Sequence, residues 1–566
     1  MNQNKKVKLI LILGGIAVVV FGIIYFGITA TKDLGKSQNL ISVEKATADM
    51  NNLYQNITVS NIQPNKDSNM LLKPDLINSL PNITNYPAQV DNSTDNYVEF
   101  FSSTEKAGTG KDGWLVEMAN KFNNSKYTLS NGKQMSVKIR GIASGVGLDY
   151  IVSGKYLPDA FSPSNELWGK MAEASGVKIA LVEKRLAGNV AGVLLSKAKQ
   201  DQLIKKYGSI NLKTITEAVA ANEIQMGYTN PFASSTGLNF LVSTLLTFDK
   251  KDPSSAKAVS GFEEFQKNIP FVSYTTLQMR DSAQSGVLDG FILEYQTLVN
   301  TPELLNNYVF TPFGVRHDSP VYEIGNLSKD KKDILKKFID FCKETNNQKI
   351  ASDYGFNTNN QYAPTIGNID GQQIIDAQKL WKQKKNSNKD IAAVFVADTS
   401  GSMLDENKLN KLKESLLNGA TYISKENSIG LVSFSDNVNI NLPIAKFDIN
   451  HRSLFSGAVN DMSANGGTAM YDAILVATKM LIDEKAKNPN LQLMLFVLTD
   501  GVKNQGIDLT QIQDILKAFK IPVYTIGYGT QVNDLSKLSS INEAASINAN
   551  TENVVYQLGS LFNAQM

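Results

Sequence analysis

Residues 391–403, IAAVFVADTSGSM, constrain the fold more than any other part of the sequence. The first seven residues are all apolar, which predicts a strand buried on both faces of a parallel sheet. Asp398, Ser400 and Ser402 follow where that strand must end, so a tight loop can direct one carboxylate and two hydroxyls at a common centre. This set of hard oxygen ligands suits Mg²⁺, which usually keeps several of its waters.

Two later segments extend this pattern. Residues 465–473, NGGTAMYDA, open a helical pattern, and residues 493–500, LMLFVLTD, form another apolar strand that ends in an aspartate. Together the three segments resemble the metal-ion-dependent adhesion site of von Willebrand factor type A domains. That resemblance implies a bound divalent cation, Mg²⁺ first and Ca²⁺ or Mn²⁺ as alternatives, held directly or through water by Asp398, Ser400, Ser402, Thr468 and Asp500. The residues alone leave another interpretation open, in which Asp398 or Ser402 only caps a helix beginning near Leu404.

Composition excludes several classes of protein. The chain has 566 residues, 42% apolar and 19% charged, which is enough for two or three globular domains. A formal net charge of +2, with no basic block beyond the N-terminus, argues against nucleic acid as a partner. The single cysteine, Cys342, excludes an intrachain disulfide and is expected to be a buried free thiol. Cys342, His317 and His451 do not have the spacing of a zinc site.

The N-terminal residues predict a membrane anchor. Residues 9–28 carry no charge, and about twenty helical residues span the roughly 30 Å hydrocarbon core. Lys5, Lys6 and Lys8 precede this run, so the N-terminus should stay in the cytoplasm and the large C-terminal part should be extracytoplasmic. Cleavage near Ala30 is the alternative, and no cysteine follows the run to anchor a lipoprotein. An exported chain without disulfides and rich in Asn and Lys is typical of a Gram-positive bacterium.

The sequence divides into five segments. Residues 1–30 form a cytoplasmic tip with a transmembrane signal anchor, and residues 31–95 an extracytoplasmic stalk or linker. A first globular domain follows at residues 96–378, then a second linker at 379–389 and a final domain at 390–566. The stalk is predicted from its polar composition and four prolines, and the second linker from five lysines that suggest a solvated hinge. In the final domain, the short strand at 439–444 is expected to be an antiparallel edge strand.

The first globular domain alternates strands and helices, which predicts a mainly parallel α/β layer structure. Its strands end in small polar clusters, where open sheets bind ligands and where helix N-termini bind oxyanions. The order of elements and the segment GYTNP…SSTG resemble the type II periplasmic solute-binding proteins of phosphate and molybdate. The resemblance implies two lobes that close on a small oxyanion near Ser103, Thr104, Ser144, Ser234, Ser235 and Thr236. Each of these could instead be a helix N-cap, and Glu105-Lys106 departs from the pattern of an anion site.

The fold class is therefore α/β, with one transmembrane helix, a bilobal type II solute-binding-protein-like domain and a Rossmann-like, doubly wound von Willebrand factor A domain. The resemblance implies a cell-surface protein that uses its metal to bind an Asp or Glu of a protein partner. The alternative is an accessory solute-binding component of an ABC-type transporter for an oxyanion. An enzyme is not expected, because the two histidines form no Ser-His-Asp arrangement and no paired carboxylates stand in an evident cleft. A chelatase-like cytoplasmic factor conflicts with the predicted orientation.

Overall fold

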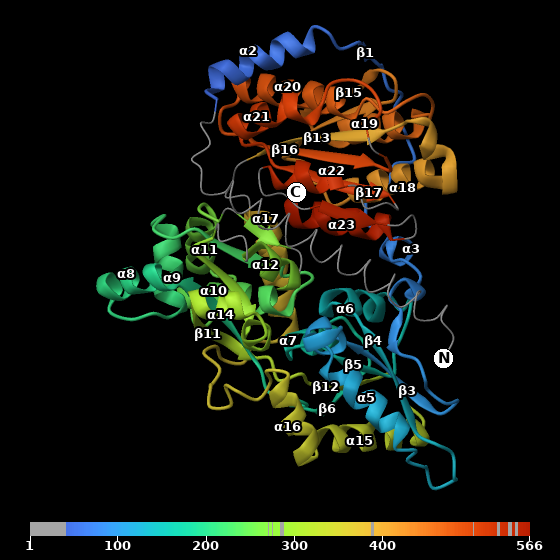
Figure 1. The fold of residues 1–566 in the computed structure, drawn as a ribbon, viewed down its shortest axis with the longest axis vertical. Coiled ribbons are helices and arrows are strands. Elements are labelled where there is room, and N and C mark those ends of the chain that lie inside the picture. The colour runs from blue at the N-terminus through green and yellow to red at the C-terminus, as the bar shows by residue number, and fades with distance from the viewer. Residues whose placement is uncertain are drawn as a thin grey trace, which may run out of the picture.

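A computed structural model describes residues 41–269, 271–273, 276–283, 288–385, 390–501, 503–528, 533–541, 546–549 and 553–566. Within them the strands form three sheets, two in a middle domain with two lobes and one in a C-terminal domain (Figure 1). The anchor predicted at residues 9–28 lies outside the described residues. None of the helices in the described ranges is both long enough and apolar enough to cross a membrane.

The first lobe of the middle domain is built on a six-stranded sheet of order β2-β4-β3-β5-β12-β6. Its central strands β4, β3 and β5 are parallel, and β2 and β12 run antiparallel to them. The strands are β2 Ala88–Val90, β3 Tyr97–Ser102, β4 Ser136–Gly141, β5 Ala160–Ser162, β6 Ile179–Glu183 and β12 Val321–Ile324. The helices of this lobe are α4 Thr104–Ala107, η2 Gly110–Asp112, α5 Trp114–Asn124, α6 Ser144–Ser153, α7 Leu167–Ala174, α15 Lys329–Lys343 and α16 Thr345–Asp353.

The second lobe is built on a five-stranded sheet of order β11-β7-β10-β8-β9. Its strands are β7 Val190–Ser196, β8 Met226–Thr229, β9 Phe271–Ser273, β10 Gly290–Glu294 and β11 Tyr308–Arg316. Its helices are α8 Lys197–Tyr207, α9 Leu212–Ala220, α10 Ser235–Phe248, α11 Ala256–Gln266, α12 Thr276–Ala283, α13 Tyr295–Val299 and α14 Pro302–Asn307. The chain crosses between the lobes at residues 184–189 and 317–320. The two crossings touch, since the His317 N–H donates to the Asn189 carbonyl at 3.0 Å.

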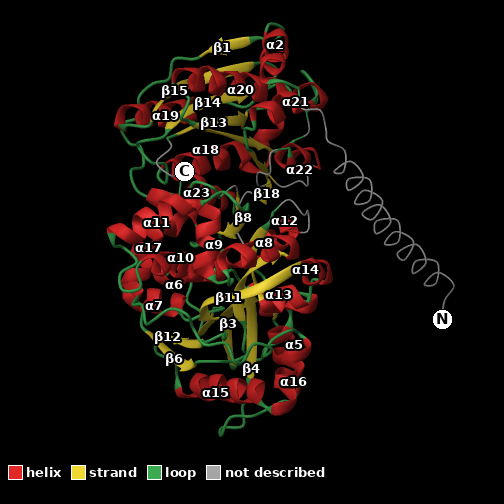
Figure 2. Cartoon of the chain, turned by 90° about the vertical axis from the view of Figure 1, so that its left-hand side faces the viewer, coloured by secondary structure: helices red, strands yellow, loops and turns green. Residues whose placement is uncertain are grey.

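The C-terminal domain is a seven-stranded sheet of order β1-β15-β14-β13-β16-β17-β18 with helices on both faces (Figure 2). Strand β1, Val59–Asn61, precedes the middle domain in the chain. The other strands of this sheet follow that domain, and they are β13 Ile391–Asp398, β14 Ser428–Phe434, β15 Val438–Lys446, β16 Gln492–Thr499, β17 Val523–Tyr528 and β18 Ser546–Ala549. Its helices are η3 Gly401–Asn407, α18 Lys408–Ala420, α19 Ile449–Asp461, α20 Met470–Lys487, α21 Leu509–Phe519, α22 Asn533–Ser540 and α23 Val554–Gln565.

The central strand β13 is buried along its whole length, as its apolar sequence predicts. Successive side chains of a strand point to opposite faces of the sheet. Phe395 therefore packs on one face with Phe562 of α23 at 4.8 Å between ring centroids, while Val394 and Val396 pack on the other face in a core that includes residues of α20. Because both faces are covered, the strand carries no polar residue before Asp398.

The predicted stalk is wrong for the described part of residues 31–95. Helix α2 (Val43–Tyr54) packs on α20 and α21 of the C-terminal domain, with Met50 in its core (Figure 1). Strand β1 (Val59–Asn61) pairs in parallel with β15, so β15 is antiparallel to β14 as predicted but is not the edge of the sheet. A free edge leaves backbone groups unpaired, and β1 satisfies them. Further along, α3 (Leu76–Ser79), η1 (Ile83–Asn85) and β2 join the first lobe.

The predicted solvated hinge at 379–389 is also wrong where it is described. Helix α17 (Gly371–Lys384) continues through most of it and packs on α7 and α10, which belong to different lobes. Trp381 on this helix has no exposed surface, and its indole Nε1 donates to the Tyr228 hydroxyl at 2.6 Å. Three of the lysines that suggested a hinge, Lys379, Lys382 and Lys384, lie on the same helix as this buried ring. Residues 386–389 lie outside the described residues.

The middle and C-terminal domains are joined by a buried polar contact. The Tyr556 hydroxyl of α23 donates to the Asp149 carboxylate of α6 at 2.6 Å. Nearby, the Lys385 ammonium donates to the Asn563 carbonyl of α23 at 3.1 Å. Burial raises the pKa of Asp149 from its ordinary value to about 6. Burial therefore favours a protonated Asp149 at mildly acidic pH, and the hydrogen bond from Tyr556 opposes this shift without cancelling it.

The burial of Asp149 predicts that this residue contributes less to the stability of the folded chain as the pH rises from about 4 to about 7. Within that window the folded state holds a proton on Asp149 that the unfolded chain has already released, so the sign is unambiguous. The loss should reach up to about 3 kcal/mol, since one pKa unit corresponds to 1.36 kcal/mol. Thermal unfolding of wild type and Asp149→Asn across this range measures it, with exposed Asp201→Asn as the control. Equal pH dependence in the Asp149→Asn variant and the wild type would contradict the assignment.

Candidate functional site

The first loop of the candidate metal centre holds Asp398, Ser400 and Ser402 together at the end of β13. Asp398 is fully buried, and its carboxylate accepts a hydrogen bond from the Ser400 N–H at 2.8 Å and another from the Thr499 hydroxyl. The hydroxyls of Ser400 and Ser402 lie 3.1 Å apart, and Ser402 donates to Asp500 at 2.8 Å. Four of the five predicted ligands are thus in one continuous group of oxygens.

The second loop reaches this group through its backbone. Gly401 N–H donates to the Gly466 carbonyl at 3.0 Å, and Asn465 N–H donates to the Thr399 carbonyl at 2.9 Å. Thr468 is 5% exposed, and its N–H donates to the Asn504 side chain of the third loop at 2.8 Å. Its hydroxyl has no hydrogen-bond partner among the described residues, so that oxygen is available for a ligand.

Electrostatics also distinguish this site from a helix cap. Burial first, and then the nearby charge of Asp500, raises the pKa of Asp398, while the hydrogen bonds from Ser400 and Thr499 act in the opposite direction. Ser400 is the N-cap residue of η3, but its side chain makes no capping hydrogen bond. Asp398 accepts from the loop rather than from the helix start, so the capping interpretation does not describe this loop.

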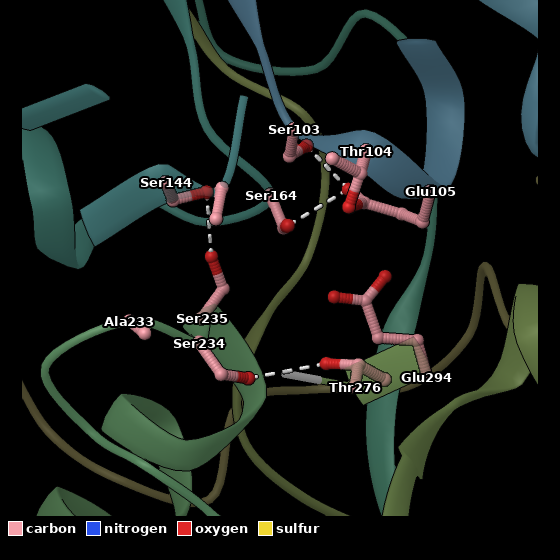
Figure 3. A pocket seen from close by; sticks show the side chains of 11 residues that line it. Ser103, Thr104, Glu105, Ser144, Ser164, Ala233, Ser234, Ser235, Thr276 and Glu294 are labelled. Carbon is pink, nitrogen blue, oxygen red and sulfur yellow. Dashed lines mark hydrogen bonds between the residues drawn. The ribbon is translucent and has the colours of Figure 1, made fainter. Parts of the chain in front are cut away.

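The pocket between the two lobes gathers most of the residues predicted to bind a solute (Figure 3). It is lined by Ser103, Thr104, Glu105, Ala143, Ser144, Ser164, Ala233, Ser234, Ser235, Thr276 and Glu294. Ser235 donates to Ser144 across the lobes at 3.0 Å. A methyl group on Gly145 would lie 2.0 Å from the Phe232 carbonyl, so glycine permits the close approach of α6 to the second lobe.

Two of the predicted solute ligands have other contacts. Thr236 does not line the pocket, and its hydroxyl lies 3.4 Å from the Glu294 carboxylate. Ser234 lines the pocket and also caps α10, since its hydroxyl accepts from the Gly237 N–H at 3.3 Å. The N-cap interpretation therefore holds for Ser234, while Ser144 lies one residue inside α6 and does not cap it.

Two carboxylates face this pocket, although the sequence suggested no paired carboxylates in a cleft. Glu294 points across the pocket toward Glu105 (Figure 3). Burial first, and then the charge of Glu105, raises the pKa of Glu294. Burial would raise the pKa of Glu105 as well, but the Lys106 ammonium and two serine hydroxyls outweigh it and lower that pKa. The pocket is acidic rather than purely hydroxyl-lined.

Comparison with known families assigns both domains. A model of the von Willebrand factor type A domain matches residues 393–564, and a model of bacterial extracellular solute-binding proteins matches residues 107–357. The chain combines a solute-binding domain with a type A domain. These domain types are those of surface or extracytoplasmic proteins, and the membrane anchor at residues 9–28 stays a prediction.

Individual similar proteins cover only parts of the chain. Thrombospondin-related anonymous protein of Plasmodium berghei (strain Anka) is 24% identical over 174 residues, 30% of this chain and 28% of that protein. The chain therefore spans less than a third of that curated relative. Iron-bound HitA from Pseudomonas aeruginosa is 11% identical and covers 52% of this chain and 99% of its own, with a TM-score of 0.36. A von Willebrand factor type A structure from Catenulispora acidiphila is 18% identical and covers 31% of this chain and 42% of its own, with a TM-score of 0.29.

The residues of the type A domain fit a small divalent cation. They present two carboxylates and three hydroxyls and no nitrogen or sulfur ligand, which is the donor set that Mg²⁺, Mn²⁺ and Ca²⁺ accept. One of the two carboxylates already has a cationic partner, since the Lys408 ammonium donates to Asp500 Oδ2 at 2.8 Å.

Lys408 is the residue at this site that the sequence did not single out. Asp500 is 2% exposed at its side chain and Lys408 15%, so the pair is largely shielded from water. Glu406 and Asn407 both have positive φ angles immediately before it, and this turn places Lys408 at the first position of α18. Lys408, six residues after the D-x-S-x-S segment, carried no signal in the sequence, because its contact with Asp500 joins residues 92 positions apart.

Proposed function

We propose that this chain is a membrane-anchored surface protein that binds rather than catalyses. Its type A domain would hold a divalent cation, Mg²⁺ first, at Asp398, Ser400, Ser402, Thr468 and Asp500. When bound, such an ion would offer a coordination position to an Asp or Glu of a protein partner. The observation that carries this proposal is the chain of contacts from Ser400 through Ser402 to Asp500, next to the buried Asp398.

The residues of the chain prepare the site without neutralising it. Asp398 is held by two donors, so its orientation is fixed before any ion arrives. The two carboxylates carry two negative charges, and the Lys408 ammonium beside Asp500 offsets one of them, so a divalent ion would keep a net positive charge that attracts an outside carboxylate. The predicted anchor and its basic flank would place the site outside the cytoplasm.

The proposal is tested with acidic peptides, because the partner is unknown. Full-length protein would be used to select displayed random peptides in MgCl₂, followed by elution with EDTA. We expect the eluted peptides to share an Asp or Glu, and to lose binding when that residue becomes Asn or Gln. Thr468→Ala should weaken capture without changing the folded structure, since it removes a hydroxyl and no charge. Peptides that bind equally well in EDTA would contradict the proposal.

The solute-binding domain supports a second candidate function, as the solute-capturing component of an ABC-type transporter. The observation in its favour is the pocket enclosed between two lobes that contact each other through Ser144 and Ser235. An oxyanion is the ligand that the sequence suggested. Glu105 and Glu294 weigh against that ligand, because an ionised carboxylate offers an anion no hydrogen-bond donor.

A further inference from the structure

We propose that the pocket between the lobes takes a small solute with one positively charged nitrogen, such as a primary amine, held between Glu105 and Glu294. This inference rests on the proposed solute-binding role of the middle domain and names the class of its ligand. It depends on four observations: a carboxylate oxygen without a donor, a neutral histidine, a lysine whose donors are already used, and a small cavity.

Glu105 provides the oxygen that lacks a donor. The residue is 8% exposed, and its Oε1 accepts hydrogen bonds from the hydroxyls of Ser103 and Ser164, the latter at 2.7 Å. Its Oε2 has no hydrogen-bond donor in the part of the chain that the structure describes. A ligand that brings an N–H group to this oxygen would give it the donor that it lacks.

Glu294 accepts a hydrogen bond from a neutral histidine rather than from a cation. His317 Nδ1 lies 2.8 Å from Glu294 Oε1, and its Nε2 lies 3.1 Å from the amide nitrogens of both Asn165 and Asn239. Backbone partners fix both amides, since each accepts a backbone N–H with its oxygen and donates to a backbone carbonyl with its nitrogen. Nε2 must therefore accept, and the ring proton is on Nδ1. The imidazole donates to Glu294 without neutralising it.

Lys106 is the cation nearest to the two carboxylates, and it is turned away from a ligand. Its ammonium lies 3.6 Å from Glu105 Oε1 and has no exposed surface. The three N–H groups have three acceptors within the protein, namely the Ser103 hydroxyl and the carbonyls of Ser162 and Pro163. Two carboxylates share this one ammonium, and burial followed by the charge of Glu105 raises the pKa of Glu294, so a positively charged ligand would favour the ionised form of Glu294 whereas an oxyanion would oppose it. An oxyanion would also receive no donor from Lys106.

The hydroxyls around the pocket reinforce this preference. Ser103 and Ser164 give their protons to Glu105, and Ser235 gives its proton to Ser144 while accepting from the Trp168 indole at 2.8 Å. Their remaining lone pairs accept rather than donate. The cavity has a volume of ≈ 30 Å³, room for about two groups of the size of water. A single ammonium or a short amine fits this space and can donate to these oxygens.

Calorimetric titration of the full-length protein tests the inference with methylammonium and ethylammonium chloride as probes. Sodium phosphate, sulfate and molybdate, and calcium chloride, are the other arms, all at equal ionic strength. We expect heat of binding and a raised melting temperature with an amine only. Glu294→Gln and Glu105→Gln should each weaken amine binding about 10- to 100-fold, the value of a hydrogen bond to a charged group. Exposed Glu303→Gln on α14 should leave it unchanged.

The outcomes separate this inference from the proposed function on which it rests. Binding of an oxyanion but not of an amine would overturn the inference and leave a solute-binding role in place. Binding of neither class would overturn both. Calcium binding that is lost in Glu105→Gln would replace the amine with a metal ion, and it would likewise overturn the inference. If one Glu variant fails to fold, the other variant and the comparison of wild-type ligands still decide the result.

Discussion

Replacing Asp398 with asparagine is expected to lower the Mg²⁺ affinity of the full-length protein by at least about 100-fold, since loss of an outer partner alone costs 10- to 100-fold at metal sites. Asparagine preserves the shape of the side chain and an oxygen for the Ser400 N–H, so the fold should survive. Asp500→Asn removes the second carboxylate and should have an effect of similar size. Titration of MgCl₂ followed by the melting temperature measures both, because a ligand that binds only the folded state raises that temperature.

Lys408→Met is the matched variant for this experiment, and it is expected to raise the Mg²⁺ affinity rather than lower it. It removes the ammonium that lies 2.8 Å from Asp500 and leaves both carboxylates in place. A divalent ion then no longer competes with a tethered positive charge, so Mg²⁺ affinity should rise. If Asp398→Asn responds to Mg²⁺ as strongly as wild type does, these oxygens do not hold the ion. A lower affinity in Lys408→Met would instead make Lys408 a structural support of the loop.

Replacing Trp381 with alanine is expected to destabilise the solute-binding domain by about 3–5 kcal/mol, the usual cost of truncating a buried tryptophan. The ring is fully buried, and it lies 5.9 Å between centroids from Phe232. Its loss also removes the indole donor from the Tyr228 hydroxyl, which lies in the core of the second lobe. Because α17 packs on helices of both lobes, its loosening should affect the whole domain.

Scanning calorimetry of the full chain measures this effect as a lowered transition of the solute-binding domain. Lys379→Ala on the same helix is the control, because its side chain is 62% exposed and pairs only with Asp376 one turn earlier. Such an exposed pair contributes little, so the control should stay within about 0.5 kcal/mol of wild type. A Trp381→Ala variant that melts like the control would mean that α17 is a peripheral hinge after all.

The elements that the sequence predicted well are those whose signal is local. The apolar run before Asp398 requires a strand covered on both faces, and β13 is such a strand. The candidate metal ligands were found for the same reason, since three short segments each carry their own pattern at a strand end or helix start. The serine clusters of the middle domain were also visible as strand ends, and five of the six predicted residues line the pocket.

The errors arose where burial depends on distant partners. The polar composition of residues 41–62 suggested a stalk, but Ala46 and Met50 form an apolar face on α2, and β1 covers the edge that β15 would otherwise expose. The lysines of residues 379–385 make that segment polar on average, so its composition gave no sign that Trp381 is buried. The contacts of Trp381 with Tyr228 and Phe232 join residues about 150 positions apart. The composition of such a segment is an average over all of its residues, whereas burial is a property of individual side chains.

The sequence by itself determined the two α/β domains, the central strand β13 and the cluster of candidate oxygen ligands at its end, because each depends on residues close together in the chain. Only the tertiary structure decided the charges that these sites face. Lys408 donates to Asp500, and Glu294 lines the same pocket as Glu105, and no spacing in the sequence predicts either arrangement. Charge interactions act through space and strengthen when water is excluded, so the electrostatic character of a site depends on which distant residues folding brings beside it.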